Sequence, residues 1–558
     1  MHYYCNPLNI TYKYQLANEK GRPVIYRESA DPSLVFFKGK YLLFPTKAEG
    51  FYTSDNMVDW EYHPFRKGQL PDGYNTETAP DVETDGEYLY YCASGTGKNS
   101  SFFRTKDVFS ENFEEFPGTF GYVDPKMFCD DDGRMYFYWG CSIDKPTFGI
   151  ELDKKTFKPI GEPVALIPFS PETAGFERYG ENHSMQPKKY TFNEGSWMTK
   201  HNGKYYLQYA TPGTEFNVYG DGVYVSDKPL GPFKMCESNP YSYCPAGFIT
   251  AAGHGSTLAD ANGEYWHIST MRISINHMFE RRLGLWRAGF DKDGVMYCDQ
   301  RYADWPRASE DAPFTKPRWM PLHLTATAAA SSGDAPEKGI SEDIRSWWTA
   351  GSADYPQWLQ ADLGACKTVN AVQINFADEG LTFDPPCVGR WVDTKTYYTR
   401  WKLEGSVDGA DWFVIADKSN ANSDLSHDFV VDEKGFTARY IRLTVYECGY
   451  KQPVKVSGLR IFGSAPVAAP AKAAVSAERI GPFDLNVSWT APGALGANVL
   501  WGIAPDKLYH SALVSGKNAY TIGALQSAQD TVYLRVDTFN EGGITEGDVF
   551  SVTAGERK

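Results

Sequence analysis

Hydrophobic and polar positions follow one pattern five times in the first half of the chain. A polar residue opens a short apolar run, a turn glycine follows eight or nine positions later, and an aromatic strand comes next. Lys-Gly, Asp-Gly and Asn-Gly turns before alternating Tyr, Phe and Leu predict β-hairpins. The units read DPSLVFFKGKYLLF from Asp31, ETAPDVETDGEYLYY from Glu77, DPKMFCDDDGRMYFY from Asp124, EGSWMTKHNGKYYLQY from Glu194 and HGSTLADANGEYWHI from His254.

The spacing of the five units predicts a repeated architecture. Their opening residues lie 46 to 70 positions apart. Five hairpin units at this spacing indicate a five-bladed β-propeller, which we assign to residues 1–312. Each blade is expected to supply its opening residue to one end of the shared axis. Four carboxylates and a histidine would then meet there.

Two smaller β domains are expected after the propeller. Residues 318–464 carry WLQADLG, WKLEGSVDGADW, ARYIRLTV and GLRIFG in order. These motifs resemble the discoidin, or F5/8 type C, module, which implies a carbohydrate-binding jelly-roll sandwich. After the Ala/Pro linker SAPVAAPAKA, residues 474–558 carry LNVSWTAP and VYLRVDTFNEGG, which resemble an immunoglobulin-like sandwich of fibronectin type III. The predicted fold class is therefore all-β throughout.

The overall composition limits the classes of ligand that the protein is expected to bind. A net charge of −15 argues against nucleic acid, because phosphate binding needs clustered Lys and Arg. Aromatic residues make up 15% of the chain, a share usual in β cores and where rings stack on sugars. The 10 cysteines show no zinc-like spacing, and no apolar run reaches the length of a membrane span.

Three of the axial carboxylates suggest a reaction. Burial raises the pKa of a carboxyl group, and a neighbouring anion raises it further. One of Asp31, Asp124 and Glu194 is therefore expected to stay protonated at neutral pH while another stays charged. Such a pair can protonate a leaving oxygen and activate water, which is the chemistry of glycosidic bond hydrolysis.

Residues from about 20 to 306 resemble the family 43 glycoside hydrolases, five-bladed propellers that mostly remove arabinofuranose or xylose with inversion. The motif SADPSLVFFKGKYLLF implies that Asp31 is the general base. The block VDPKMFCDDDGRMYFYWG implies that Asp124 raises the pKa of the acid and orients it, and EGSWMTKHNGKYYLQY implies that Glu194 is that general acid. The resemblance thus implies an inverting, exo-acting hydrolase of plant-type polysaccharide or oligosaccharide.

The same resemblance implies further site residues. His254, in GHGSTLADANGEYW, matches a histidine that faces the central channel and holds a water or, directly or indirectly, a calcium ion. No cofactor is required. Arg281 or Arg282, in FERRLGLWRAGF, is expected to reach sugar hydroxyls, and which of them faces the site is left open. Trp139 and Trp197 are expected either to stack on the substrate or to pack between blades.

The chain departs from the family at blade two. Relatives usually show Trp-Ala-Pro where this chain has Thr78-Ala79-Pro80, with Glu77 before it. A small Thr in place of a large ring should widen the pocket or change its polarity, and Glu77 is expected to bind hydroxyls of the terminal sugar. A galactofuranoside therefore stays open as an alternative substrate, and a glycan-binding propeller without turnover stays open as an alternative of another class. The first residues lack a signal-peptide pattern, yet the sandwich modules imply a secreted, periplasmic or cell-surface location.

Overall fold

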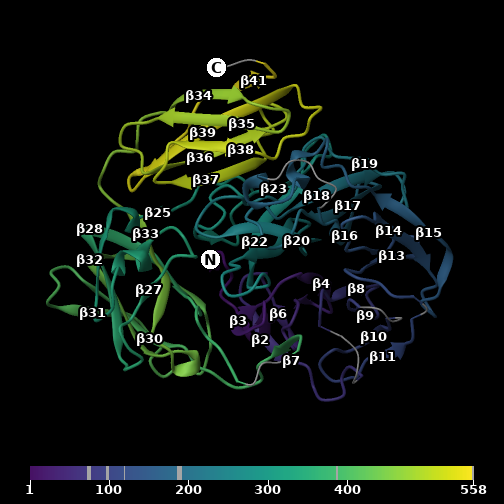
Figure 1. Cartoon of the computed structure of the whole chain (residues 1–558), viewed down its shortest axis with the longest axis horizontal. Helices are drawn as coiled ribbons and strands as arrows, with labels where there is room; N and C mark the ends of the chain where they lie inside the picture. Colours follow the sequence, from purple (N-terminus) through teal and green to yellow (C-terminus); the bar gives the residue numbers. More distant parts are fainter. Residues whose placement is uncertain (72–76, 96–99, 119, 185–190, 385–387, 556–558) are drawn as a thin grey trace.

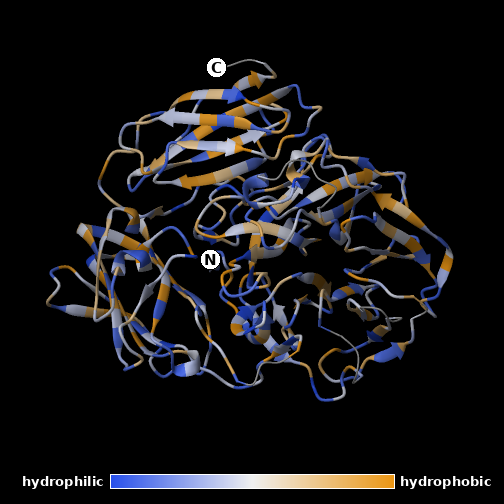
Figure 2. Ribbon diagram, viewed as in Figure 1, coloured by the Kyte–Doolittle hydropathy of each residue, from blue (hydrophilic) through white to orange (hydrophobic). Residues whose placement is uncertain are grey.

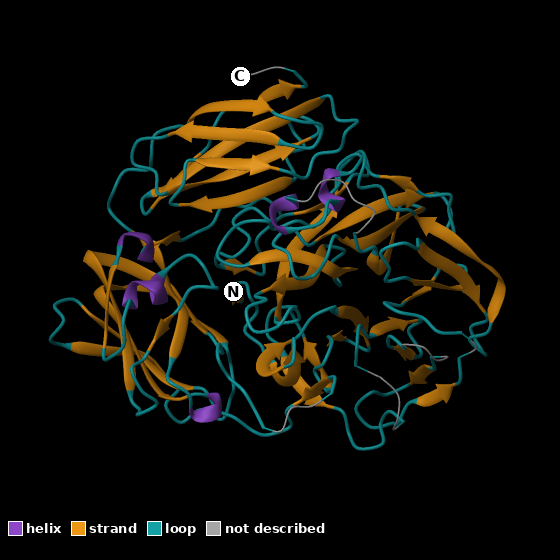
Figure 3. Cartoon of the chain, in the orientation of Figure 1, coloured by secondary structure: helices purple, strands orange, loops and turns teal. Residues whose placement is uncertain are grey.

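The computed structural model of the chain describes residues 1–558 except 72–76, 96–99, 119, 185–190, 385–387 and 556–558. Regular structure in this part is almost entirely β-strand, which confirms the all-β fold class (Figure 3). The helices are short 3-10 turns: η1 (Gly175–Glu177), η2 (Glu181–His183), η3 (His323–Thr325), η4 (Pro336–Ile340) and η5 (Gly449–Lys451). None of the helices among the described residues has the length and apolarity of a membrane span.

Five four-stranded antiparallel sheets follow one another along the first half of the chain. We call them blades 1 to 5. Their strands are β4 (Ser33–Phe37), β5 (Lys40–Phe44), β6 (Gly50–Ser54) and β7 (Glu61–Pro64); β8 (Asp81–Thr84), β9 (Leu89–Cys92), β10 (Phe102–Thr105) and β11 (Glu114–Phe116); β12 (Lys126–Cys129), β13 (Met135–Trp139), β14 (Thr147–Leu152) and β15 (Pro159–Ile167); β16 (Glu194–His201), β17 (Lys204–Thr211), β18 (Gly220–Ser226) and β19 (Lys234–Met235); β20 (Thr250–Ala259), β21 (Tyr265–Arg272), β22 (Arg281–Phe290) and β23 (Met296–Cys298).

The blades close into a ring. The first strand of each blade contacts the first strand of the next, and β20 of blade 5 contacts β4 of blade 1. This is the arrangement of a five-bladed propeller with the first strands innermost. The first two strands of every blade form the expected hairpin. Gly39 in blade 1 and Gly203 in blade 4 turn with φ of 84° and 76°, which a residue with a side chain rarely adopts.

The N-terminal strands join the propeller to the second domain. Strand β2 (Lys13–Glu19) pairs with β3 (Arg22–Glu28) on one side and with β29 (Arg390–Val392) of the second domain on the other. A further pair, β1 (Tyr3–Tyr4) with β24 (Arg307–Ala308), follows blade 5. Backbone hydrogen bonds of one sheet therefore cross the boundary between the two domains.

The second domain is an eight-stranded antiparallel sheet. It folds over an apolar core that includes Trp348, Trp401 and Ile441, all fully buried. Two strands of 20 and 21 residues run the length of this domain. The strands are β25 (Met320–Pro321), β26 (Thr327–Ala330), β27 (Trp348–Thr349), β28 (Gln357–Phe376), β30 (Arg400–Ser406), β31 (Trp412–Asp417), β32 (His427–Glu447) and β33 (Lys455–Ser464).

The third domain has two antiparallel sheets. One contains β34 (Ala474–Arg479), β35 (Leu485–Thr490) and β38 (Ala519–Ile522), and the other contains β36 (Gly496–Gly502), β37 (His510–Ser515), β39 (Thr531–Asn540), β40 (Gly543–Thr545) and β41 (Phe550–Thr553). Buried and exposed residues alternate along β35, as a sandwich strand requires, and Figure 2 shows the mixed hydropathy of these yellow strands of Figure 1. The relation to fibronectin type III stays a prediction.

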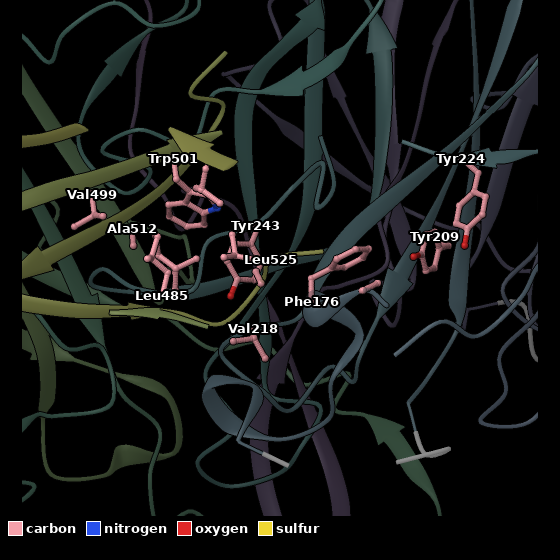
Figure 4. Close-up of a cluster of buried hydrophobic side chains, with 14 of the residues drawn as sticks. Phe176, Tyr209, Val218, Tyr224, Tyr243, Leu485, Val499, Trp501, Ala512 and Leu525 are labelled. Atoms are coloured by element: carbon pink, nitrogen blue, oxygen red, sulfur yellow. The ribbon is translucent and has the colours of Figure 1, made fainter. Parts of the chain in front are cut away.

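The third domain shares its core with the propeller. Phe176 and Tyr243 of the propeller lie in one buried cluster with Leu485 and Trp501 of the third domain (Figure 4). The ion pair of Arg178 with Asp484, at 2.5 Å, closes the edge of this contact. A continuous apolar core fixes one domain on the other. The third domain is therefore a packed part of the structure and not a free spacer.

Candidate active site

Three of the predicted axial residues share an unusual backbone. Asp31, Asp124 and His254 have φ of 48°, 51° and 48°, in the left-handed region that residues with side chains seldom occupy. The amide of Asp31 donates to Thr270 Oγ1 at 2.8 Å, and the amide of Asp124 donates to Ser94 Oγ at 2.9 Å. In both cases the hydroxyl belongs to the preceding blade. Contacts between blades therefore fix the direction in which these side chains enter the axis.

Blade 2 has no carboxylate at this position. Ala79 has φ of 41°, donates its amide to Thr46 Oγ1 at 2.8 Å and precedes a proline, as Asp31 and Asp124 do. Glu77 lies two residues earlier, so the prediction that it opens the repeat is wrong. The hairpin of blade 2 is shorter than the others. Nine positions before Gly86 therefore lies Glu77, whereas the residue equivalent to Asp31 is Ala79. Three axial carboxylates remain instead of four.

Asp31 is buried and held in its charged form. Its two oxygens accept hydrogen bonds from Arg281 Nη1 at 2.9 Å and Arg281 Nη2 at 3.0 Å, and Thr46 Oγ1 donates to Oδ2 at 2.7 Å. Burial alone would raise the pKa of Asp31, but Arg281, His254 and Thr46 outweigh it and hold the pKa below its ordinary value. Asp31 is therefore an anion at neutral pH, as a general base must be.

Asp124 is the carboxyl that retains a proton. It is buried, and it accepts the amide of Gly195 at 3.3 Å. Carboxylate oxygens of Asp124 and Glu194 lie within 4.8 Å of each other. Burial raises the pKa of Asp124 to about 7, and the negative charges of Glu194 and Asp31 add to the rise against the pull of His254. A proton is thus kept beside Glu194 up to nearly neutral pH.

His254 lies between these two environments. Its Nδ1 is 3.3 Å from Asp31 Oδ1 and 3.8 Å from Asp124 Oδ2. Burial disfavours the imidazolium, but the surrounding carboxylates prevail and raise the pKa of His254 above its ordinary value. Buried Asp221, from blade 4, accepts the amides of His254 at 2.7 Å and of Gly255 at 3.0 Å, which fixes the backbone under the ring.

A calcium ion at His254 does not fit this arrangement. Calcium takes six to eight oxygen ligands. The carboxylates that face the ring are those of Asp31 and Asp124. They already accept hydrogen bonds from Arg281, Thr46 and Gly195, and His254 supplies the positive charge between them.

Glu194 has two partners that sequence reasoning missed. Tyr219 donates its hydroxyl to Glu194 Oε1 at 2.6 Å, and the Cys141 thiol donates to Oε2 at 3.1 Å. Burial and the neighbouring Glu194 raise the pKa of the Cys141 thiol far above its ordinary value. Cys141 stands just past the end of β13, at the same edge of the propeller as the axial carboxylates. The position of Cys141 directly after a predicted strand could have indicated that it lies at this edge, whereas no pattern in the sequence singles out Tyr219.

The two arginines face different ways along β22. Arg281 binds Asp31 as described, and also binds Glu28 Oε1 through Nη2 at 2.6 Å. Arg282 is buried on the other face, where its Nε donates to Nε2 of His427 of the second domain at 2.7 Å. Successive strand residues point to opposite sides. Of the two arginines, Arg281 therefore lies beside Asp31 and Arg282 points away from it, and contact of an arginine with substrate stays a prediction.

The aromatic and rim predictions have mixed outcomes. Trp197 is only 6% exposed, and its indole N–H donates to Thr257 O at 2.9 Å, so a stacking role on substrate is contradicted. Trp139 is half-buried in an aromatic cluster, with the ring of Phe120 at 5.3 Å. Glu77 is half-buried, and burial together with Glu49 raises its pKa to about 7. Substrate contact by Trp139 and Glu77 stays a prediction.

Two segments of the chain match known protein families. Residues 20–296 match the family described as glycosyl hydrolases family 43, and residues 323–456 match the F5/8 type C domain. A β-D-galactofuranosidase of Aspergillus niger is 24% identical over 281 residues, covering 44% of this chain and 74% of the relative. A xylosidase/arabinosidase of Bacteroides ovatus is 25% identical over 251 residues, covering 37% and 75%. A xylosidase/arabinosidase of Humicola insolens is 25% identical over 341 residues, covering 49% and 97%.

Solved structures resemble this chain at lower sequence identity. A thermostable family-43 glycoside hydrolase is 21% identical with a TM-score of 0.44, covering 55% of this chain and 99% of that chain. An exo-1,5-α-L-arabinanase from a bovine ruminal metagenomic library is 22% identical with a TM-score of 0.37, covering 49% and 97%.

Proposed function

Because residues 20–296 of this chain form a domain of glycosyl hydrolases family 43, we propose that the protein is an inverting, exo-acting glycoside hydrolase that releases terminal arabinofuranosyl or xylosyl residues. Its substrate is proposed to be a plant-type polysaccharide or oligosaccharide. The F5/8 type C domain at residues 323–456 is proposed to bind carbohydrate.

The observation that carries this proposal is the unequal environment of the axial carboxylates. Asp31 has Arg281 and His254 as cationic partners and a lowered pKa, whereas the pKa of Asp124 is raised to about 7 beside Glu194. One site thus contains a permanent anion and a carboxyl pair that keeps a proton. Unequal pKa values of this kind separate the base from the acid in glycoside hydrolysis.

The chemistry follows from these positions. Asp31 accepts a proton from a water molecule, which attacks the anomeric carbon from the side opposite the leaving group. Glu194 gives the one proton that it shares with Asp124 to the glycosidic oxygen as that bond breaks, and the proton that Asp31 takes from the water returns to this pair through solvent. Attack by water in one step reverses the anomeric configuration. Arg281 and Thr46 hold the base still throughout.

A test of turnover uses the charge-neutral variant Asp31→Asn. Loss of a general base is expected to lower kcat about 100-fold to 10,000-fold. The matched control is Asp55→Asn, which removes an exposed carboxylate of blade 1 that pairs with Lys40. Full activity in Asp31→Asn, or equal loss in both variants, would refute the proposal. A glycan-binding propeller without turnover predicts no sugar release from any variant.

The stereochemical course is tested separately. Proton NMR of the first-formed sugar should show an anomeric configuration opposite to that of the substrate bond. Retention of configuration would exclude direct water attack assisted by Asp31.

The choice of sugar is tested with a panel of nitrophenyl glycosides. The names of the Bacteroides and Humicola relatives support an arabinofuranoside or xyloside, and the name of the Aspergillus relative supports a galactofuranoside. Thr78 at blade two favours a wider pocket and keeps the galactofuranoside as the second candidate. The preferred glycoside is the one with the highest kcat/KM, and release of single sugars from arabinan or arabinoxylan tests exo action. An exported location belongs to the same proposal and is tested by cell fractionation.

A further inference from the structure

The second domain sends one side chain into the charge network of the site. Arg390 lies in β29, opposite Ala17 of β2. Its Nη1 donates to both oxygens of Glu28, at 2.8 Å and 2.7 Å. Glu28 is fully buried at the end of β3, and Arg390 is 17% exposed. The guanidinium of Arg390, from the second domain, thus forms an ion pair with the buried carboxylate of Glu28 outside that domain.

The contact continues to the proposed base. Arg281 donates to Glu28 Oε1 through Nη2 at 2.6 Å, and the same guanidinium binds both oxygens of Asp31. Both arginines also lie over the ring of Phe279, with Arg390 at 4.2 Å and Arg281 at 4.9 Å from its centroid. The chain of contacts Arg390, Glu28, Arg281 and Asp31 alternates in charge without a gap.

Arg281 is shared between two carboxylates, and this decides what Arg390 does. If Arg281 were the sole cation beside Glu28, the charge of Arg281 would be divided between Glu28 and Asp31. The ionised form of Asp31 would then be stabilised less. With Arg390 in place, two carboxylates face two guanidinium groups. Glu28 is then neutralised from the second domain, and Arg281 is free to stabilise the anion of Asp31.

We propose that Arg390 of the second domain is a positioning residue for the catalytic site, which keeps Asp31 ionised by neutralising Glu28 and so releasing Arg281 to the base. This inference rests on the proposed role of Asp31. It gives the second domain a task in the reaction that is separate from carbohydrate binding.

The other groups that act on Asp31 come from three blades and from the second domain. Those with charge or a titratable proton are Arg281, His254, Asp124, Tyr219, Cys141 and Arg390. Arg390 lowers the pKa of Asp31 even across the intervening residues. Only Arg390 in this set comes from outside the propeller.

The test measures the ionisation of Asp31 directly. Full-length protein labelled with carbon-13 at the aspartate carboxyl is titrated by NMR, and the Asp31 signal is assigned by its loss in Asp31→Asn. In Arg390→Met the midpoint of Asp31 is expected to rise by about one pH unit. Arg390→Lys, which keeps the charge, should restore most of the shift. The acidic limb of the kcat/KM profile should move with the NMR midpoint.

Two further variants separate charge from folding. In the double variant Glu28→Gln/Arg390→Met both charges are gone, so the Asp31 midpoint should return to that of the parent. Asp424→Asn breaks the ion pair of the second domain with Arg27, the neighbour of Glu28 in β3, at 2.9 Å. This control loosens the same boundary from the opposite strand face, and it should leave the midpoint in place.

The outcomes are decisive in either direction. An unmoved Asp31 midpoint in Arg390→Met, or an equal shift in Asp424→Asn, overturns the inference. A midpoint that stays raised in the double variant also overturns it, because the effect then does not act through Glu28. If the parent protein hydrolyses no glycoside while the NMR shifts appear as expected, the proposed function is refuted. The effect of Arg390 on the ionisation of Asp31 is then still supported.

Discussion

The pairing of Asp124 with Glu194 makes a quantitative prediction for Asp124→Asn. Their oxygens lie within 4.8 Å of each other. At an effective dielectric constant of about 20, two charges at that separation repel by about 3 kcal/mol, which corresponds to about 2 pH units. Without the Asp124 charge, the acid loses its proton more easily. The basic limb of the kcat/KM profile is therefore expected to move down by about 2 pH units.

The assay is the kcat/KM profile on the preferred nitrophenyl glycoside, because that profile reports the free enzyme. The control is Glu77→Gln. Burial and Glu49 raise the pKa of Glu77 to about 7 as well, yet no contact joins it to Glu194 among the residues described. Its variant should leave the basic limb in place. A limb unmoved in Asp124→Asn, or moved in Glu77→Gln alone, would show that the wrong carboxyl has been assigned to the acid pair.

Three more predictions concern the groups around the acid. Tyr219→Phe removes a donor that favours the ionised acid, so the basic limb should rise by about one unit; a fall would contradict this assignment. In Gly195→Ala the new Cβ would lie 2.7 Å from the His254 ring at φ of 62°, and kcat should fall at least about tenfold. Gly203→Ala has comparable backbone strain with no atom within 4 Å, so equal losses in kcat would exclude the clash as the cause. Cd²⁺ should inhibit by binding between the Cys141 thiolate and the two acidic side chains within 4.8 Å. Cys141→Ser should raise the inhibition constant about tenfold, and unchanged inhibition would place the ion elsewhere.

The ring of blades could be predicted from the sequence because its signals are local. A turn glycine and an alternating aromatic strand fix each hairpin within about 15 residues, and the period of the repeat then fixes the ring. Asp31 and Asp124 lie just before the first strand of a blade and His254 lies within one, all three with a left-handed backbone. Their convergence follows from the repeat alone. The same rule failed at Glu77 because one hairpin is shorter, and spacing alone does not record where the first strand begins.

The partners of these residues could not be predicted in the same way. Arg390 is 362 positions from Glu28, and it reaches the site only because β29 pairs with β2 of the N-terminal region. Whether Arg281 or Arg282 points inward depends on the register of β22, which a shift of one residue would reverse. The sequence left stacking on substrate and packing between blades both open for Trp197, and a shift in register between Glu194 and Trp197 accompanies its burial. Contacts across blades and domains decide these cases.

Charge balance explains why the site holds a proton at all. The buried and half-buried groups that lie against one another include Asp31, Asp124, Glu194 and Glu28 as carboxylates, with Arg281, Arg390 and His254 as cations. A buried cluster disfavours net charge. Four anions against three cations therefore retain one proton.

The position of that proton follows from the same contacts. Asp31 and Glu28 each have a guanidinium partner, whereas Asp124 and Glu194 face each other. The proton consequently resides on the acid pair, where the leaving oxygen needs it. Asp221 does not alter the count, because burial raises its pKa to about 8 and keeps it neutral near pH 7. Removing Arg390 would leave four anions against two cations, which makes the charged form of Asp31 harder to hold. Under the proposed roles, the second domain is thereby coupled to the protonation state on which the proposed hydrolysis depends.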